Sequence, residues 1–298
     1  MIVVDFNQTA IANFMAEIGG RNTNNIEVDL PLLRHMIINT IRSYKVRFGS
    51  DYGEMVLAMD NRRYWRRDVF PHYKAHRKKG RDDSPLDWPA IFGALNIIRD
   101  DLSEFFPYPC IDVEGAEADD VIGTLAEYSQ TKGEPQGLFD EIEPEPFLII
   151  SGDHDFNQLQ KYKNVKQYAP AFKKWVKIKE SADQVLMEHI ITGDKGDGVP
   201  NMLSPDDCFV TGTRQSPIKK KLLAEWKTKP PEEWVVNSEM AHGFNRNQLL
   251  VDLSKTPQEI KDNIINSYEA QQGGDRSQLL NYFIKNKMRG MMDVVTDF

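Results

Sequence analysis

The sequence predicts an α/β protein in which a central, mostly parallel sheet is flanked by helices and followed by a smaller all-helical domain. Short apolar runs rich in β-branched residues alternate with helical patterns as far as about residue 182. Beyond that point the helical patterns continue without further strands of the sheet. Because 298 residues is about the length of two domains, we expect an α/β domain at 1–182 and a helical domain at 183–298.

The main predicted strands each end in an acidic residue. The runs are Met-Ile-Val-Val-Asp-Phe at 1–6, Met-Val-Leu-Ala-Met-Asp at 55–60 and Phe-Leu-Ile-Ile-Ser-Gly-Asp-His-Asp at 147–155. The acidic residues at their ends are Asp5, Asp60, Asp153 and Asp155. Ligands of open α/β sheets bind outside the carboxyl ends of the strands, so these side chains are candidates for a site. The alternative for Asp153 and Asp155 is a cap on a helix at 156–162.

The remaining segments carry helical or turn patterns. An apolar stripe runs from about Leu30 to Phe48, with Asp29 and Pro31 at its start and Gly49 as its stop. Further helices are expected at about 87–106, from 116, and at about 219–227, 239–253, 257–270 and 275–290. A short strand at 109–114 and an edge hairpin at 165–169 and 175–179 complete the sheet, while 134–146 and 201–217 are expected to be loops.

Composition excludes several classes of protein. Hydrophobic residues make up 40% of the chain and charged residues 28%, as in an ordinary soluble globular protein. No apolar run approaches the roughly 18–20 residues of a membrane span, and the strand-like start has no leader pattern. Two cysteines, Cys110 and Cys208, are too few for a disulfide framework or a Cys-based zinc site. We therefore expect a cytoplasmic protein with no membrane partner.

The net charge of −8 hides strongly charged blocks. Residues 109–155 hold thirteen Asp or Glu against Lys132 alone, whereas residues 61–81 hold nine Lys or Arg against Asp68 alone. The basic block is interleaved with Tyr64, Trp65, Phe70 and Tyr73, a composition typical of a surface that binds phosphates and stacks on bases. A solvated helix face is the alternative. The candidate nucleic-acid contacts are Arg62, Arg63, Arg66, Arg67, Lys78 and Lys79, with Lys219, Lys220 and Lys221 in a second basic cluster.

Further carboxylates are expected to join those at the strand ends. The helix that begins near residue 116 carries Glu117, Asp119 and Asp120 in its first turn, although the helix dipole alone also favours acidic residues there. A glycine-rich turn at 193–200 adds Asp194 and Asp197.

Such a gathering of carboxylates needs cations. Two carboxylates about 4 Å apart repel by about 4 kcal/mol at an effective dielectric of about 20, so the cluster is not stably ionised unless cations fill it. Oxygen ligands without clustered Cys or His favour Mg²⁺ or Mn²⁺ over Zn²⁺, and His154 beside the cluster is interpreted as a packing or solvent-facing residue. With basic surfaces nearby, the residues predict metal-assisted phosphodiester hydrolysis.

The order of the acidic motifs resembles the flap-endonuclease family of 5′-nucleases, and within it the T-even bacteriophage ribonuclease H type. The motifs are strand-Asp at 5, strand-Asp at 60, Glu-Ala-Asp-Asp at 117–120, Ser-Gly-Asp-x-Asp at 151–155 and Gly-Asp-x-x-Asp at 193–197. Segments 64–68, 161–167 and 173–179 add to a likeness that covers nearly the whole chain. The resemblance implies the 5′-nuclease (PIN-like) fold, with 183–298 as a helical DNA-binding domain.

The resemblance also implies a function and a role for each candidate residue. A member of this family is a 5′→3′ exonuclease and flap endonuclease that acts on RNA–DNA hybrid, duplex, and flap or forked DNA, and removes lagging-strand RNA primers in phage replication. Two Mg²⁺ ions are implied, for which Mn²⁺ can substitute. One ion neighbourhood comprises Asp5, Asp60, Glu117, Asp119 and Asp120, and the other Asp153, Asp155, Asp194 and Asp197. Residues 61–85 correspond to an arch over the 5′ end, with Lys74 and Arg77 as the candidate catalytic residues.

The chain departs from the family pattern in two places. Residues 201–208 replace the Gly-Ile-Gly hairpin through which many members grip duplex with a monovalent ion, and the Gln-containing clamp peptide of the cellular enzymes is absent. The expected protein partners of this monomer are the single-stranded-DNA-binding protein and the sliding clamp of the replisome. Two alternatives stay open: a structure-specific DNA-binding protein with a non-catalytic acidic cluster, and an unrelated single-strand ribonuclease.

Overall fold

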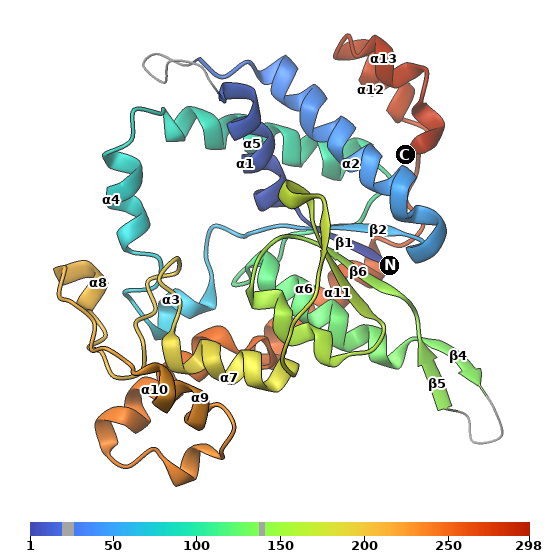
Figure 1. Ribbon diagram of the computed structural model, residues 1–298. Helices are drawn as coiled ribbons and strands as arrows, with labels where there is room; N and C mark the ends of the chain where they lie inside the picture. The colour runs from blue at the N-terminus through green and yellow to red at the C-terminus, as the bar shows by residue number, and fades with distance from the viewer. Residues whose placement is uncertain (20–26, 137–140) are drawn as a thin grey trace.

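The computed structural model describes residues 1–19, 27–136 and 141–298. Its centre is a six-stranded sheet with the strand order β3-β2-β1-β6-β7-β8 (Figure 1). The strands are β1 (Ile2–Asp5), β2 (Met55–Ala58), β3 (Cys110–Ile111), β6 (Phe147–Ile150), β7 (Val165–Ala169) and β8 (Lys174–Val176). Neighbours are parallel except for β7 and β8, which confirms the mostly parallel sheet. Val4 is level with Leu57 and Ile150, so the central strands end together.

Side chains that alternate along the strands divide the core into two layers. Ile2 and Val4 point to the face covered by α1 (Phe6–Ile18), α2 (Leu30–Tyr52) and α5 (Trp88–Phe105). Val3 points to the face covered by α6 (Ala118–Tyr128) and α11 (Gln258–Ala270). All four residues of β2 and of β6 are buried, because both faces of the sheet are covered.

The described chain after β8 is helical. Its α-helices are α7 (Ala182–Thr192), α8 (Cys208–Thr211), α9 (Lys220–Trp226), α10 (Ser238–Val251), α11, α12 (Leu279–Lys285) and α13 (Arg289–Met292). A small separate core that contains Ile191, Trp234 and Phe244 lies among α7, α9 and α10. By contrast, α12 contributes Phe283 to the core beneath α2 and α5. The division at residue 182 stays a prediction, and the last helices share their core with the sheet.

The basic block lies between β2 and α5 and forms α3 (Trp65–Val69) and α4 (His76–Asp82), of which α4 stands apart from the sheet (Figure 1). Short 3-10 helices complete the structure: η1 (Ser129–Thr131), η2 (Asp155–Lys161), η3 (Pro170–Phe172), η4 (Pro231–Glu233), η5 (Leu253–Lys255) and η6 (Val295–Asp297). Among the described helices, none combines the length and the apolar character that crossing a bilayer requires.

Several elements differ from the sequence-based predictions. Helix α1 is absent from those predictions, and Asp5 caps it by accepting a hydrogen bond from Gln8 N at 2.9 Å. Helix α2 passes through Gly49, the predicted stop, and ends at Tyr52, with Gly53 as its C-cap, whose φ of 77° suits glycine. The predicted loop at 134–146 contains β4 (Gly133–Gln136) paired with β5 (Glu141–Pro144), and its residues 137–140 lie outside the described part. The helix expected at 156–162 is the 3-10 helix η2.

The packing of α12 predicts a contrast between two neighbouring residues. Phe283 is fully buried, with ring centroids 6.0 Å from Phe106 and 5.3 Å from Phe298, whereas Ile284 is 57% exposed. Phe283→Ala should lower the free energy of unfolding by about 3–5 kcal/mol, and Ile284→Ala should change it by less than about 0.5 kcal/mol. Urea unfolding followed by circular dichroism measures both. Equal losses would mean that α12 is not part of the sheet's core.

Candidate active site

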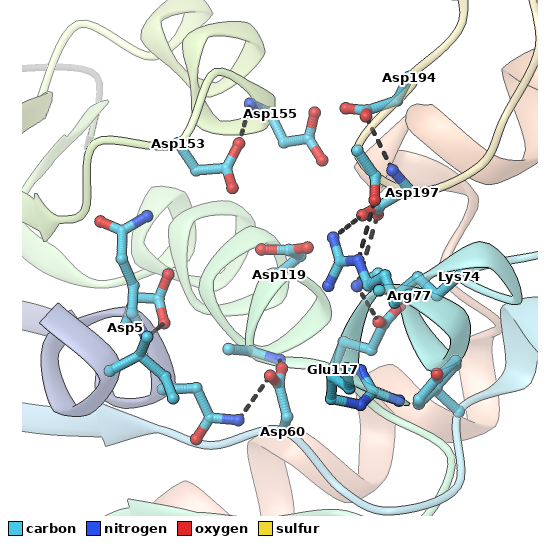
Figure 2. Close-up of a pocket in the computed structure, with 18 of the residues that line it drawn as sticks. Asp5, Asp60, Lys74, Arg77, Glu117, Asp119, Asp153, Asp155, Asp194 and Asp197 are labelled. Carbon is cyan, nitrogen blue, oxygen red and sulfur yellow. Dashed lines mark hydrogen bonds and ion pairs between the residues drawn. The ribbon is translucent and has the colours of Figure 1, made fainter. Parts of the chain in front are cut away.

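A cleft of about 890 Å³ opens where β1, β2 and β6 end. Eight of the nine predicted metal ligands line it: Asp5, Asp60, Glu117, Asp119, Asp153, Asp155, Asp194 and Asp197. Figure 2 shows these carboxylates pointing into one space, together with Lys74 and Arg77. The fold therefore brings acidic residues from five separate segments of the sequence to one place.

The carboxylates of Asp5 and Asp60 are held by neighbouring elements. Asp5 accepts hydrogen bonds from Gln8 N at 2.9 Å and from Ser151 Oγ at 3.2 Å. Asp60 accepts from Ala118 N at 2.8 Å and from Asn7 Nδ2 at 2.6 Å. Burial, with the charge of Asp60 added, raises the pKa of Asp5 to about 7. The residues of α1 that directly follow β1 therefore help to hold both carboxylates in place.

Asp119 lies in the middle of the acidic cluster, with Asp153 and Asp155 on one side of it (Figure 2). Asp119 lies in the first turn of α6, while the other two follow β6. Burial, and then the charges of Asp153 and Asp155, raise the pKa of Asp119 well above its usual range. Burial likewise raises the pKa of Asp155 to about 7, although His189 opposes this and Asp153 adds to it. These three carboxylates repel one another, which favours a bound cation.

His189 is a site residue that the sequence analysis missed. Its Nδ1 lies 3.2 Å from Asp155 Oδ1 and its Nε2 lies 3.3 Å from Asp194 Oδ2. One ligand atom from each of the three residues lies within 4.8 Å of the others, so the group could hold a metal ion. Burial opposes protonation, but the hydrogen bond to Asp194 raises the pKa of His189. Its position one turn before the Gly-Asp motif was the available signal, whereas His154 is exposed.

The turn that carries Asp194 and Asp197 is closed by glycine. At Gly193, with φ of 67°, a Cβ atom would lie 2.4 Å from Pro200 O, so no other residue fits. At Gly198, with φ of 74°, a Cβ atom would lie 2.9 Å from His76 Nδ1. The turn therefore touches the beginning of α4 closely.

Lys74 and Arg77 face the carboxylates from the arch. Lys74 Nζ lies 2.6 Å from Glu117 Oε1 and 3.4 Å from Asp197 Oδ2, and its main-chain N–H donates to Asp197 O at 2.7 Å. Arg77 forms an ion pair with Asp197 and donates from Nε to Gly196 O at 2.8 Å. Burial raises the pKa of Glu117, with Lys74 opposing. Both predicted catalytic cations thus lie at the cleft.

Asp120 and Arg66 require corrections. Asp120 is fully buried and accepts hydrogen bonds from Arg66 Nη1 at 2.8 Å, Trp65 Nε1 at 3.2 Å and Thr256 Oγ1 at 2.6 Å. Burial disfavours ionisation of Asp120, but Arg66 outweighs this effect and lowers the pKa of Asp120. Asp120 therefore faces away from the cleft. Arg66 is only 1% exposed and cannot be a surface contact for nucleic acid.

Three of the four aromatic residues of the basic block are placed differently from the prediction, whereas Tyr64 lines the cleft. Trp65, Phe70 and Tyr73 are buried, and Phe70 and Tyr73 pack with Val199. Tyr73 Oη donates to Asp197 Oδ2 at 2.6 Å. These rings therefore support the base of the arch and do not stack on bases, because the block folds back onto the turn at 193–200.

The other predicted nucleic-acid contacts are exposed. They are Arg62, Arg63, Arg67, Lys78 and Lys79 in the arch region and Lys219, Lys220 and Lys221 at the start of α9. Arg67 lines the cleft, and Arg63 is partly engaged with Asp68 at 3.3 Å. The three lysines of α9 do not line the cleft, so they would contact nucleic acid outside it.

Two family descriptions match the sequence. The family "5'-3' exonuclease, N-terminal resolvase-like domain" matches residues 1–192, and the family "T4 RNase H, C terminal" matches residues 180–298. The ribonuclease H of Enterobacteria phage T4 is 31% identical, over 99% of this chain and 95% of that protein. The DNA polymerase I of Caldicellulosiruptor bescii is 28% identical over 68% of this chain, which corresponds to 22% of the polymerase.

Solved structures share the fold. The T5 D15 protein co-crystallised with metal ions aligns with a TM-score of 0.59 at 15% identity, over 91% of this chain and 98% of that one. The T5 5′-exonuclease with bound divalent metal ions (zinc) aligns with a TM-score of 0.60 at 15% identity, over 91% and 99%. At this identity the likeness establishes the architecture alone. Because the family matches and the T4 relative together span the whole sequence, the chain belongs to the 5′-3′ exonuclease family, with a C-terminal part of the T4 RNase H type.

Proposed function

We propose that this chain hydrolyses RNA–DNA hybrid and duplex DNA from 5′ ends and cuts flap or forked DNA, with two Mg²⁺ ions for which Mn²⁺ can substitute. The observation that carries this proposal is the convergence of eight carboxylates with Lys74 and Arg77 on one cleft. The alternative, a DNA-binding protein with a non-catalytic acidic cluster, gains nothing from an acidic pocket that faces a polyanion, because like charges repel.

The carboxylates fit a pair of divalent cations. Burial, and then the charges of Asp153 and Asp155, raise the pKa of Asp119, and oxygen ligands suit hard ions such as Mg²⁺. We assign one ion to Asp5, Asp60, Glu117 and Asp119, and the other to Asp153, Asp155, Asp194 and Asp197. Asp119 faces both groups (Figure 2). The chemistry that such ions supply when bound is Lewis-acid activation of water and stabilisation of the leaving oxygen.

The chain's own cations complete the proposed site. Lys74 and Arg77 are ion-paired with Glu117 and Asp197 in the free protein. Ammonium and guanidinium groups also bind phosphate oxygens, so an entering phosphate can take over part of these interactions. We assign Lys74 to the charge that develops on the scissile phosphate and Arg77 to the orientation of that phosphate.

The proposed role in the cell is removal of lagging-strand RNA primers during phage DNA replication. It would take place in the host cytoplasm, with the enzyme as a monomer and with the single-stranded-DNA-binding protein and the sliding clamp as partners. Residues 183–298 would contact the duplex, and the exposed Lys219, Lys220 and Lys221 support this assignment.

Substitutions in the acidic cluster should lower turnover without weakening the binding of DNA. Asp119→Asn or Asp153→Asn should lower kcat at least about a hundredfold, as should EDTA, while DNA affinity is retained or tightened because repulsion of phosphates falls. The matched control is Asp100→Asn, whose side chain is 69% exposed. Rates on a 5′-labelled RNA–DNA hybrid and on a flap substrate measure the effect. Full activity in EDTA would refute the mechanism, and a wild-type protein inert with Mg²⁺ and Mn²⁺ would favour the binding-protein alternative.

Crowded carboxylates also predict how stability depends on pH. Asp5 and Asp155 have pKa values of about 7 in the folded protein against a usual 3.8, and the pKa of His189 is raised as well. Groups with raised pKa values stabilise the fold when protonated, so the metal-free protein should lose stability as pH rises from about 5 to about 8. Asp194, with its pKa lowered to about 2, acts only below this range.

Added Mg²⁺ should reverse this trend, since it binds the deprotonated carboxylates. Melting temperatures across that pH range, with EDTA and with Mg²⁺, provide the measurement. A melting temperature of the metal-free protein that rises with pH would contradict the electrostatic account of the site.

Lys74 and the α9 lysines should behave differently. Lys74→Ala should lower kcat by about two orders of magnitude, the loss expected when a cation that meets developing charge is removed, and should change affinity only slightly. Replacing Lys219, Lys220 and Lys221 together by Ala should weaken binding and reduce the salt slope by up to about three units, with saturated turnover nearly unchanged. Single-turnover rates and binding isotherms in Ca²⁺ test both. If Lys74→Ala lowers only the affinity, the arch merely steers the substrate and the assignment of Lys74 to the chemical step is wrong.

A further inference from the structure

The cleft has an aromatic part that the proposed chemistry does not use. Besides the carboxylates, it is lined by Ile11 of α1, Arg81 of α4, and Trp88 and Phe92 of α5. Phe92 is 41% exposed, while Trp88 is partly packed against the core beneath α5. A single exposed ring needs no explanation. Two adjacent rings and an arginine inside the cleft that holds the acidic cluster are a more specific arrangement.

We call this group (Arg81, Trp88 and Phe92) the stacking patch, and its two rings and cation lie next to one another in the lining of the cleft. The rings of Trp88 and Phe92 have centroids 5.6 Å apart and planes inclined by 32°. The guanidinium carbon of Arg81 lies 6.0 Å from the centroid of the Phe92 ring. Among the described residues, none accepts a hydrogen bond from Trp88 Nε1, which is buried. The patch therefore presents a ring face and a cation to the cleft.

The chemistry of the patch matches one component of a nucleic acid. Nucleobases stack on aromatic side chains without regard to sequence, and arginine adds both cation–π attraction and a contact for phosphate. A base inside a duplex has both of its faces covered by its neighbours, whereas an unpaired base has faces free to stack on a protein ring. Because the patch lines the same cleft as the carboxylates, a strand whose phosphate reaches Asp119 has a nucleotide within the same enclosure.

We propose that the stacking patch is a subsite for an unpaired base of the strand being cut, beside the scissile phosphate. This inference rests on the proposed function and refines its substrate. A strand with at least one unpaired 5′ nucleotide, such as a short flap or a frayed end, is preferred over a fully paired 5′ end. Arg81, at the end of α4, then couples the arch to the same nucleotide.

The first test detects stacking directly and needs no cleavage. A flap substrate carries 2-aminopurine as its first unpaired nucleotide, and the protein is added in Ca²⁺. Stacking on Phe92 should quench the fluorescence, Phe92→Leu should remove most of the quenching, and Phe92→Trp should retain it. The matched control is Ile97→Leu on the same helix, because Ile97 is 45% exposed but does not line the cleft. Quenching that Phe92→Leu leaves unchanged would overturn the proposal.

The second test uses cleavage with Mg²⁺ and crosses the protein change with a substrate change. Phe92→Leu should slow cutting of the flap substrate about five- to 150-fold, the range that corresponds to one base–aromatic stack. An abasic nucleotide at the same position should slow the wild-type enzyme by a similar factor, and the two changes together should cost no more than either alone. Losses that multiply would show that Phe92 and the base do not interact.

The two tests separate this inference from the proposed function. If the wild-type protein cuts no substrate with Mg²⁺ or Mn²⁺, the proposed function fails, while the fluorescence measurement still decides whether the patch holds a base. If cutting proceeds and a fully paired 5′ end is processed as fast as a one-nucleotide flap, the nuclease assignment stands and the subsite is refuted.

Discussion

Mutual repulsion of carboxylates at one edge of the sheet is the constraint on which the site depends. The protein meets it in two ways. Main-chain and side-chain donors fix Asp5 and Asp60, and internal cations offset Glu117 and Asp197. Asp119 receives the least compensation, which its raised pKa reflects, whereas His189 partly offsets the charge of Asp155. The arch, the turn at 193–200 and the first turn of α6 are held together by the same charges that the cleft needs for its chemistry.

Much of the fold could be predicted from local patterns. The strands are continuous apolar runs because helices cover both faces of the sheet, and their acidic ends mark the edge where ligands bind. Helix boundaries that depend on the backbone conformation of a single residue could not be predicted as well. Gly49 and Gly53 are equally good helix stops in a sequence, and only the structure shows that Gly53 takes the positive φ. Helix α1 has no separate start signal in the sequence, because its cap, Asp5, is also the last residue of β1.

Within the site, residue type could be predicted but orientation could not. Asp119 and Asp120 are adjacent, yet side chains one residue apart on a helix point about 100° away from each other. Only the packing of α6 decides that Asp119 faces the cleft while Asp120 meets Arg66 inside the protein. Likewise, Tyr64 and Tyr73 both belong to the basic block, and the structure buries Tyr73 while Tyr64 lines the cleft. His189 was missed because its partners are distant in sequence or lie beyond a turn.

The approach of Gly198 to α4 determines where the arch can move. A side chain at position 198 would collide with His76 Nδ1 and with His72 O, so backbone and arch meet there with no space between them. The N–H of Lys74 is bound to Asp197 O in the same joint. The base of the arch is therefore joined to the acidic turn by a hydrogen bond and by close packing. A movement of the outer arch, between His76 and the start of α5, would leave this joint intact and keep the Lys74 main chain beside the acidic turn.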